Sequence, residues 1–285
     1  MVHMIYTHSL LTQKPQYPIY PPYHVGLYLE DYFLDRFIKE NPQTERDYIG
    51  ISWTTLYCDG KSHYIQSFLD SIPADKKYFT VSQHDDAPAH KLPENTLMFS
   101  AGGNIRHKNI IPIPLICSQL PIDITKIENI KKNYLASFVG SNTHPIRTIM
   151  AEACKNVSEI SIKMKGWSPA VSETDFHSFL DLAMQSEFCL CPRGYGLNSF
   201  RLYEAMQLGC IPVIITDEFY LPWQDELNWS EFSVLISKDN IPNIVDILKI
   251  YKPEDINRMR NKIKEIYPSY FTMDGLYKNI LKRLV

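Results

Sequence analysis

The sequence lacks several features that would assign it quickly to a class. None of its six cysteines forms a Cys-x-x-Cys pair. No stretch approaches the roughly 18 apolar residues of a membrane span. The start of the chain holds His3, Thr7 and His8 where a targeting segment would have a basic region followed by an apolar run. These absences predict a soluble, cytoplasmic protein with reduced thiols.

The overall charge of the chain is small. Of its 285 residues, 45% are hydrophobic and 21% are charged, and the formal net charge is -3. This composition is typical of a globular protein, and the length suffices for two domains. Binding to nucleic acid or to an anionic membrane usually needs a basic surface, so the weakly acidic balance argues against both as the main partner.

The two halves of the chain differ in pattern. In the first half we expect strands over residues 48–54, 78–82 and 96–101, an extended segment over 110–116, and helices over 31–39 and 62–71. In the second half we expect strands over 135–139, 160–165, 188–191 and 211–215, with helices over 145–156, from 172 onward and over 199–208. Regular alternation of this kind is typical of βαβ units with a parallel sheet.

The segment 122–133 is polar and has little periodicity, so we place a domain boundary there. From residue 241 onward the chain looks helical almost to its end. We therefore expect an N-terminal domain over 1–133, a C-terminal domain over 134–262 and a final helix over 263–285.

The segment 188–217 contains the strongest ligand signal, since it is predicted to run from strand to loop to helix to strand. Its loop is Pro192-Arg193-Gly194-Tyr195-Gly196-Leu197-Asn198. The two glycines allow a tight turn and a close approach between ligand and backbone. The helix expected to begin near Ser199 directs free N–H groups and its positive dipole end toward the loop, and Arg193 adds a charge for phosphate oxygens. These residues predict a site for a phosphate-bearing ligand.

Two charged residues follow on the expected helix. Arg201 and Glu204 are one helical turn apart, so both can lie near the ligand while Leu202 and Met206 pack away from it. A carboxylate can accept both hydroxyls of a ribose diol. The alternative is an ordinary strand-to-helix turn in which Glu204 merely pairs with Arg201.

Two other phosphate-binding patterns compete with this interpretation. The P-loop pattern fails, because no Gly-Lys-Ser/Thr follows the glycines. The spacing from Gly194 through Gly196 to Ser199 is one residue away from the dinucleotide GxGxxG pattern, and Asp217 follows the next strand. Ser199 replaces the third glycine, yet a nicotinamide-dependent oxidoreductase stays open as an alternative.

The run Phe188-Cys-Leu-Cys-Pro-Arg-Gly-Tyr-Gly-Leu-Asn-Ser-Phe-Arg-Leu-Tyr-Glu-Ala-Met resembles the signature of the exostosin family of glycosyltransferases, glycosyltransferase family 47. Further stretches resemble the family pattern: Phe138-Val139-Gly140, Arg147, Gly209-Cys-Ile-Pro-Val-Ile, Leu221-Pro222-Trp223 and Asn228-Trp229. The resemblance is strong over residues 135–235 and loose before them, chiefly at 78–86. It is greatest with small members from large algal viruses, among them a xylosyltransferase that acts on capsid glycans.

The resemblance implies a GT-B fold, an α/β architecture with two Rossmann-like domains facing across a cleft. The glycan acceptor would bind residues 1–133 and the nucleotide sugar residues 134–262, and the last helix would cross back to the first domain. The implied enzyme inverts the anomeric configuration and takes its sugar from a UDP-sugar, with UDP-xylose as the best guess. Carried over by position, the donor would be bound by Arg147, Gly140, Ser141, Arg193, Gly194, Tyr195, Gly196, Asn198, Ser199, Arg201 and Glu204. Arg193 and Arg147 would hold the diphosphate and Glu204 the ribose.

Many glycosyltransferases hold a metal ion with an Asp-x-Asp pair, and this chain contains none. Charge that builds on the leaving diphosphate then needs another positive group. Arg193, Arg147 and the helix end could supply it, so we expect no metal ion and no other cofactor.

The reaction also needs a base that deprotonates the acceptor hydroxyl. Our candidate is Asp85, with Asp86 second and His84 as an orienting partner. They follow the strand expected over 78–82, and ligands of open α/β sheets bind at the carboxyl ends of strands. An Asp-Asp turn that merely ends a strand is the alternative. Other candidates for the base are Glu30, Asp31, His8, His24, His63 and His90. Without a working base, the chain would be a non-catalytic sugar-nucleotide-binding protein.

Overall fold

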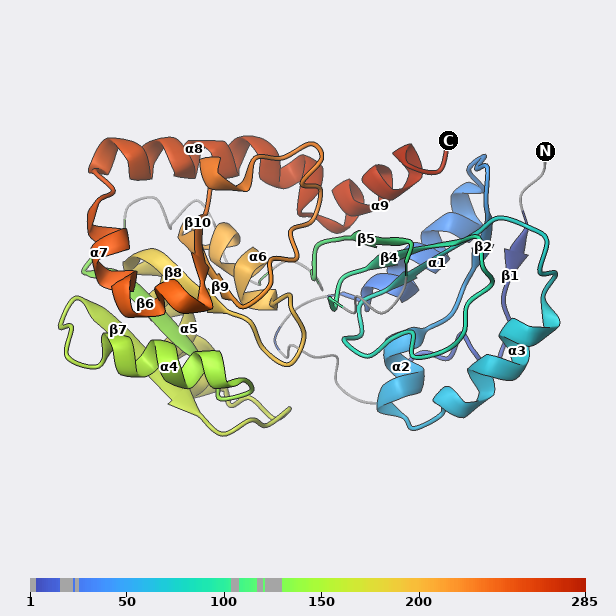
Figure 1. Ribbon diagram of the computed structural model, residues 1–285, viewed down its shortest axis with the longest axis horizontal. Helices are drawn as coiled ribbons and strands as arrows, with labels where there is room; N and C mark the ends of the chain where they lie inside the picture. The colour runs from blue at the N-terminus through green and yellow to red at the C-terminus, as the bar shows by residue number, and fades with distance from the viewer. Residues whose placement is uncertain (1–3, 16–22, 24–25, 104–107, 117–119, 121–129) are drawn as a thin grey trace. The chain divides into compact units, whose positions relative to one another are not determined.

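The structure of the chain is a computed structural model that describes residues 4–15, 23, 26–103, 108–116, 120 and 130–285 (Figure 1). It divides into two compact units, each built on a parallel sheet. The first comprises Met1–Ile19, Gly26–Ser118 and Ser269–Val285, and the second Tyr20–Val25 and Gln119–Pro268. The expectation of two Rossmann-like α/β units is thereby confirmed. Most of the segment 122–133, where we placed the domain boundary, lies outside the described residues.

The first unit contains a five-stranded parallel sheet in the order β1-β2-β3-β4-β5. Its strands are β1 (Ile5–Tyr6), β2 (Asp47–Ile49), β3 (Tyr78–Ser82), β4 (Thr96–Ser100) and β5 (Ile110–Pro112). Its helices are α1 (Leu29–Glu40), α2 (Trp53–Cys58), η1 (Ser62–Tyr64), α3 (Ile65–Ser71) and α9 (Met273–Lys282). The strand expected over 48–54 is only partly right, because the chain leaves the sheet after Ile49. Helix α2 begins at Trp53, whose buried indole N–H donates to Thr80 Oγ1 at 3.0 Å.

Aromatic side chains form the centre of the first unit. Tyr48 of β2 and Phe79 of β3 stack with ring centroids 4.7 Å apart, and Phe33 of α1 meets Tyr48 edge-on at 5.4 Å. Tyr277 of α9 lies 5.1 Å from Phe33. Each such pair adds about 1 kcal/mol beyond the apolar area that it buries. The last helix of the chain is therefore part of the core of the first unit.

The second unit contains a five-stranded parallel sheet in the order β10-β9-β8-β6-β7. Its strands are β6 (Tyr134–Ser141), β7 (Ile160–Lys165), β8 (Ser186–Pro192), β9 (Ile211–Thr216) and β10 (Val234–Ser237). Its helices are α4 (Pro145–Cys154), α5 (Glu173–Met184), α6 (Phe200–Gln207), η3 (Trp229–Glu231), η4 (Lys238–Asn243), α7 (Ile244–Lys249) and α8 (Pro253–Tyr270), and the division between the units falls inside α8. The alternation expected between residues 135 and 215 is confirmed. Strand β10 was not expected.

Successive residues of the central strands serve opposite faces of the second sheet. Phe138 of β6 and Phe188 of β8 join a buried cluster with side chains of α4, α7 and the start of α8. On the other face Ser137 donates its hydroxyl to the Leu182 carbonyl of α5 at 3.3 Å, and α6 packs on β8 and β9. Both faces of the sheet are thus covered, which leaves the carboxyl ends of its strands as the place for a ligand.

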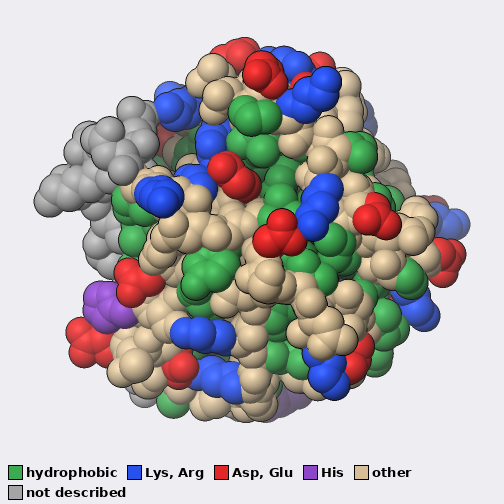
Figure 2. Space-filling model, turned by 90° about the vertical axis from the view of Figure 1, so that its left-hand side faces the viewer, with side chains coloured by type: hydrophobic (Ala, Val, Ile, Leu, Met, Phe, Trp, Pro, Cys, Tyr) green, Lys and Arg blue, Asp and Glu red, His purple; other side chains and the backbone are tan. Residues whose placement is uncertain are grey.

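The surface drawn in Figure 2 interleaves Lys and Arg side chains with Asp and Glu side chains. Among the described helices, none combines the length and the apolar character needed to cross a lipid bilayer. Four of the described cysteines are buried as free thiols, and Cys58 is exposed.

Candidate functional site

The connections of the second sheet diverge at β6. From β6 the chain passes through α4 to β7 on one side, and then through α5 to β8 on the other. Ligands of open α/β sheets bind outside the carboxyl ends of the strands at such a switch point. The loop after β6 (142–144) and the loop after β8 (193–199) leave the sheet at this edge. They define the candidate site of the second unit.

Strands β6 and β8 separate before they end. Their pairing covers Tyr134↔Ser186, Ala136↔Phe188 and Ser137↔Cys189. Beyond that point β6 stays paired with β7 up to Ser141↔Lys165, and β8 with β9 up to Pro192↔Ile215. Backbone carbonyls that face the gap need other donors, since an unpaired buried carbonyl destabilises the fold. Arginine side chains from two helices supply those donors.

Arg147, in the first turn of α4, bonds the chain on both sides of the gap. Its Nη1 donates to the Ser141 carbonyl at 2.7 Å, its Nε to the Arg193 carbonyl at 3.0 Å and its Nη2 to the Pro192 carbonyl at 3.3 Å. A Cβ at Gly194 would lie 3.0 Å from that Nη2, so a glycine gives the guanidinium its room. The guanidinium that we assigned to the diphosphate is therefore engaged by backbone.

Arg201 of α6 fills the same gap from the opposite face. Its Nη2 donates to the Val139 carbonyl at 2.9 Å, and its Nη1 lies 2.9 Å from Glu204 Oε2. Its Cζ lies 3.3 Å from the ring centroid of Phe179. The Glu204 side chain is only 9% exposed. Both charges that we expected beside the ligand are thus engaged with each other inside the unit.

Arg193 lies at the rim of the loop after β8. Its Nη1 forms an ion pair of 2.6 Å with Asp217, which follows β9, and its Nη2 donates to the Tyr195 carbonyl at 3.0 Å. Burial would raise the pKa of Asp217, but the hydrogen bond and charge of Arg193 outweigh burial and hold that pKa below its usual value. The Asp217 side chain is 41% exposed, so the carboxylate that pairs with Arg193 is solvated.

The rest of this loop divides into an exposed and a buried part. Tyr195 is 65% exposed. Asn198 is buried, and its Oδ1 accepts the backbone N–H of Ser199 at 2.9 Å and the Tyr203 hydroxyl at 3.1 Å. Ser199 is the N-cap of α6, and its hydroxyl makes no capping bond. Asn198 therefore shapes the loop, while Tyr195 and Ser199 belong to its outer side.

Two further glycines were expected at the donor. Gly140 lies in β6, and a Cβ there would come within 2.7 Å of the Phe138 ring, so packing alone accounts for a glycine at this position. Gly196 lies in the loop after β8 and is partly exposed.

His144 lies at the same edge and was not among the expected residues. It is the N-cap of α4, where its Nδ1 accepts the Ile146 N–H at 3.3 Å and Pro145 takes the first helical position. Burial lowers the pKa of His144, and the positive charge of Arg193 lowers it further. With Nδ1 accepting, the neutral ring holds its proton on Nε2. A polar residue directly before a proline that opens a helix was the signal for this N-cap.

In the first unit, His84, Asp85 and Asp86 form the turn that follows β3. The His84 Nδ1 accepts the Asp86 N–H at 3.1 Å, and its ring centroid lies 4.8 Å from that of Tyr57. Burial lowers the pKa of His84. Because Nδ1 accepts, the neutral ring holds its proton on Nε2 and is a donor there. Asp85 and Asp86 are partly exposed, so the turn offers carboxylates at the carboxyl edge of the sheet.

The position of this turn is set by backbone packing. A Cβ at Gly102, after β4, would lie 2.6 Å from Asp85 Cα and 2.6 Å from the His84 carbonyl oxygen. Real Cβ atoms do not come this close to backbone, so the glycine lets the loops after β3 and β4 touch.

Glu30 and Asp31 are buried in the first turn of α1, each 1% exposed. Glu30 Oε1 accepts the Thr54 N–H at 2.6 Å, and Asp31 Oδ1 accepts the Ser52 hydroxyl at 2.5 Å. Their other oxygens have no hydrogen-bond partner among the described residues. Burial raises the pKa of both carboxyls, and the charge of Asp31 adds to the effect on Glu30, whose pKa rises to about 7.

The histidines kept as rivals for the base are placed differently. His90 is held between the Tyr57 hydroxyl at 3.1 Å and the Ser62 carbonyl at 3.0 Å. His8 and His63 are exposed, and His24 lies outside the described residues.

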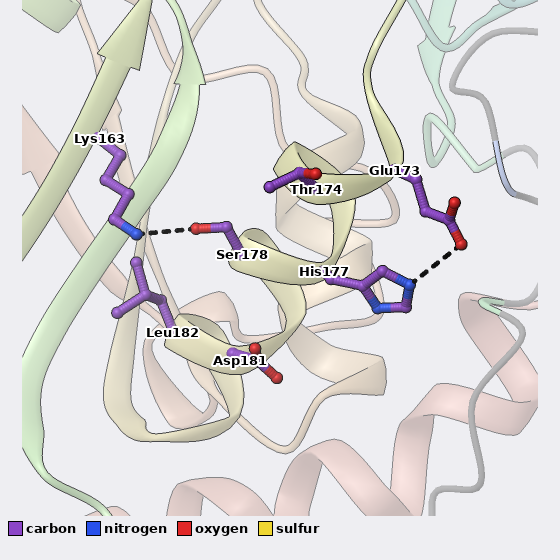
Figure 3. A pocket seen from close by; sticks show the side chains of 7 residues that line it. All are labelled: Lys163, Glu173, Thr174, His177, Ser178, Asp181 and Leu182. Atoms are coloured by element: carbon purple, nitrogen blue, oxygen red, sulfur yellow. Dashed lines mark hydrogen bonds and ion pairs between the residues drawn. The ribbon is translucent and has the colours of Figure 1, made fainter.

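A shallow pocket of about 620 Å³ lies between β7 and α5 (Figure 3). Lys163 Nζ donates to Ser178 Oγ at 2.9 Å, and His177 Nε2 lies 3.6 Å from Glu173 Oε1. The lining consists of Lys163, Glu173, Thr174, His177, Ser178, Asp181 and Leu182, and it includes no residue that we assigned to the donor or the base.

Together these features define a protein with two Rossmann-like parallel sheets and a candidate site at the switch point of the second. The family model of the exostosin GT47 domain matches residues 17–251. The match spans most of the chain, and the chain therefore belongs to the exostosin GT47 domain family.

Two curated relatives show how far the likeness extends. A probable glycosyltransferase of Arabidopsis thaliana is 33% identical over 132 residues, which are 46% of this chain and 24% of the plant protein. The exostosin-1 homolog of Caenorhabditis elegans is 24% identical over 275 residues, covering 84% of this chain and 69% of the nematode protein. The chain thus spans about a quarter of the length of the plant relative. Among solved structures, WaaG, a glycosyltransferase involved in lipopolysaccharide biosynthesis, superposes with a TM-score of 0.43 at 9% identity, covering 88% of this chain and 80% of WaaG.

Replacement of Glu30 by Gln should change how stability depends on pH. The folded pKa of about 7 lies above the ordinary 4.5, so the folded chain holds this proton more tightly than the unfolded chain. The resulting stabilisation is complete below pH 4.5 and is lost as the pH rises through 7, a change of roughly 3 kcal/mol. Glu30→Gln keeps the acceptor for Thr54 and should abolish this loss, as measured by urea unfolding on both sides of the window. An equal fall in stability in both proteins would contradict the assignment.

Proposed function

We propose that the chain is a glycosyltransferase that moves a sugar from a UDP-sugar, with UDP-xylose as the proposed donor, to a hydroxyl of a glycan acceptor with inversion at the anomeric carbon. Family membership supports the class of reaction. The observation that carries the donor half is that Arg193 and the first turns of α4 and α6 meet at the switch point of the second sheet. Helix N-termini and a guanidinium stabilise the negative charge of a diphosphate.

In the proposed reaction a base takes the proton of the acceptor hydroxyl while its oxygen attacks the anomeric carbon. The bond between that carbon and the diphosphate oxygen breaks, and UDP leaves with the electron pair. We propose Asp85 as the base, because it lies in a partly exposed turn at the carboxyl edge of the first sheet. Asp86 is the second candidate, and His84 orients the turn through its bond to the Asp86 N–H.

The proposal includes a reaction without a metal ion. The lack of an Asp-x-Asp pair and the positive groups at the switch point support metal independence. A non-catalytic sugar-nucleotide-binding protein is the competing function, and turnover distinguishes the two. Family membership does not favour the nicotinamide-dependent oxidoreductase.

A panel of nucleotide sugars tests the proposed activity directly. UDP-xylose, UDP-glucuronic acid, UDP-N-acetylglucosamine and UDP-galactose are compared for thermal stabilisation and for slow release of UDP, each with and without excess EDTA. We expect at least one UDP-sugar to stabilise the chain and to be hydrolysed equally fast with the chelator. Binding without turnover would favour the binding protein, and loss of turnover in EDTA that manganese restores would contradict metal independence.

Replacement of Asp85 by Asn should remove the base while preserving the shape of the turn. We expect turnover to fall by about 100-fold or more, with UDP affinity unchanged, because proton transfer is lost and the donor site lies in the other unit. Asp86→Asn is the matched control, since it removes the neighbouring carboxylate from the same turn. Near-normal turnover in Asp85→Asn, or an equal loss in Asp86→Asn, would argue against Asp85.

Replacement of Asp217 by Asn should strengthen UDP binding. The change frees Arg193 from its 2.6 Å ion pair, so the diphosphate no longer exchanges with a carboxylate. We expect the Kd for UDP to fall about 3-fold to 10-fold at low salt, consistent with the modest strength of exposed ion pairs. Asp246→Asn on the exposed side of α7 makes the same change of net charge away from the loop. Weaker binding in Asp217→Asn would show that the carboxylate supports the site instead of competing for it.

A further inference from the structure

We infer that Arg147 is a positioning residue that joins the loops after β6 and β8, and that it does not itself hold the diphosphate. The inference rests on the proposed function, because the loops that it joins form the proposed donor site. It also reverses the role that the sequence suggested for this arginine.

The hydrogen bonds of Arg147 carry the inference. Nε, Nη1 and Nη2 of one rigid, planar group donate to carbonyls of two chain segments, Ser141 at the end of β6 and Pro192 with Arg193 at the end of β8. At distances of 2.7 to 3.3 Å, three of the five N–H donors of the guanidinium, one on each nitrogen, thereby go to backbone carbonyls. The loop carbonyls therefore set the orientation of the planar group, and a phosphate oxygen is limited to the second N–H of Nη1 or Nη2.

The surroundings of the guanidinium support the same role. The Phe138 ring lies 5.5 Å from Arg147 Cζ, and a Cβ at Gly194 would come within 3.0 Å of Nη2 and 3.2 Å of Thr143 Oγ1. Gly194 thus admits the arginine to the loop, a reason for this glycine other than close approach of a ligand. With β6 and β8 unpaired beyond Ser137↔Cys189, Arg147 is what fixes the spacing of the two loops.

A lysine at position 147 distinguishes positioning from direct contact. Lysine keeps the charge, but its single nitrogen cannot occupy the three donor positions of the fork. For a positioning residue, Arg147→Lys and Arg147→Met should weaken UDP binding by a similar factor, about 10-fold or more, and leave its salt dependence like that of the native chain. For a direct phosphate contact, Lys would restore most of the affinity, and Met would lose both affinity and salt dependence. That second pattern, measured by calorimetric titration, would overturn the inference.

Gly194→Ala provides a test that needs no ligand. Its methyl group would press on Arg147 Nη2, so it should lower the urea midpoint in the native background and much less beside Arg147→Met. Equal effects in both backgrounds would refute the contact.

Arg258→Met, which removes the same charge from a 72% exposed position, is the surface control. If Arg147→Met does not fold, Arg147→Lys and Gly194→Ala still show whether UDP binding depends on the hydrogen-bond geometry of the guanidinium or only on its positive charge. If the native chain binds no UDP, the proposed function fails, and the unfolding cycle alone decides the role of Arg147.

Discussion

The structure of the second unit depends on hydrogen bonds that replace the ladder where two neighbouring parallel strands separate. Strands β6 and β8 pair as far as Ser137↔Cys189 and then turn to different neighbours, which opens the edge at which a ligand can bind. The same separation takes carbonyls out of the ladder. Arg147 from one face of the sheet and Arg201 from the other donate to them, and each guanidinium lies over a phenylalanine ring. Carbonyls left unpaired at this opening would destabilise the unit. Hydrogen bonds from charged guanidinium groups, which are stronger than neutral hydrogen bonds, satisfy them instead.

This solution determines which charges remain for a ligand. Arg147 and Arg201 serve the backbone, and Glu204 is closed in with Arg201. The positive character at the edge then comes from the first turns of α4 and α6 and from Arg193, whose partner Asp217 is solvated. In the proposed donor site, binding of a diphosphate would exchange one anion for another at Arg193. Such an exchange would require less additional desolvation of Arg193 than binding by an arginine that has no ion-pair partner. The reason is that the Arg193 side chain is already only 15% exposed in its ion pair with Asp217.

Local patterns in the sequence predicted the elements of this edge, and non-local contacts decided what its residues do. Strand β7 was expected with the bounds that it has, and the strand-loop-helix order around Arg193 was correct, because periodicity and turn residues are local signals. The acceptors of Arg147 Nε and Nη2 lie 46 and 45 residues away along the chain, a distance over which sequence alone shows no pairing. Helix α2 was missed because Trp-Thr-Thr-Leu-Tyr has strand propensity, which the burial of Trp53 against Thr80 overrides.

The first unit shows why burial and catalysis make opposite demands on a carboxylate. Burial brings the pKa of Glu30 to about 7, the range in which a general base works best near neutral pH. The same burial leaves the side chain 1% exposed, so an acceptor hydroxyl cannot reach it in this conformation. Asp85 combines partial exposure with a backbone position that Gly102 fixes from the neighbouring strand. A catalytic base has to contact the proton that it removes, so exposure favours Asp85 over Glu30 as the proposed base, even though the pKa of Glu30 is the better matched.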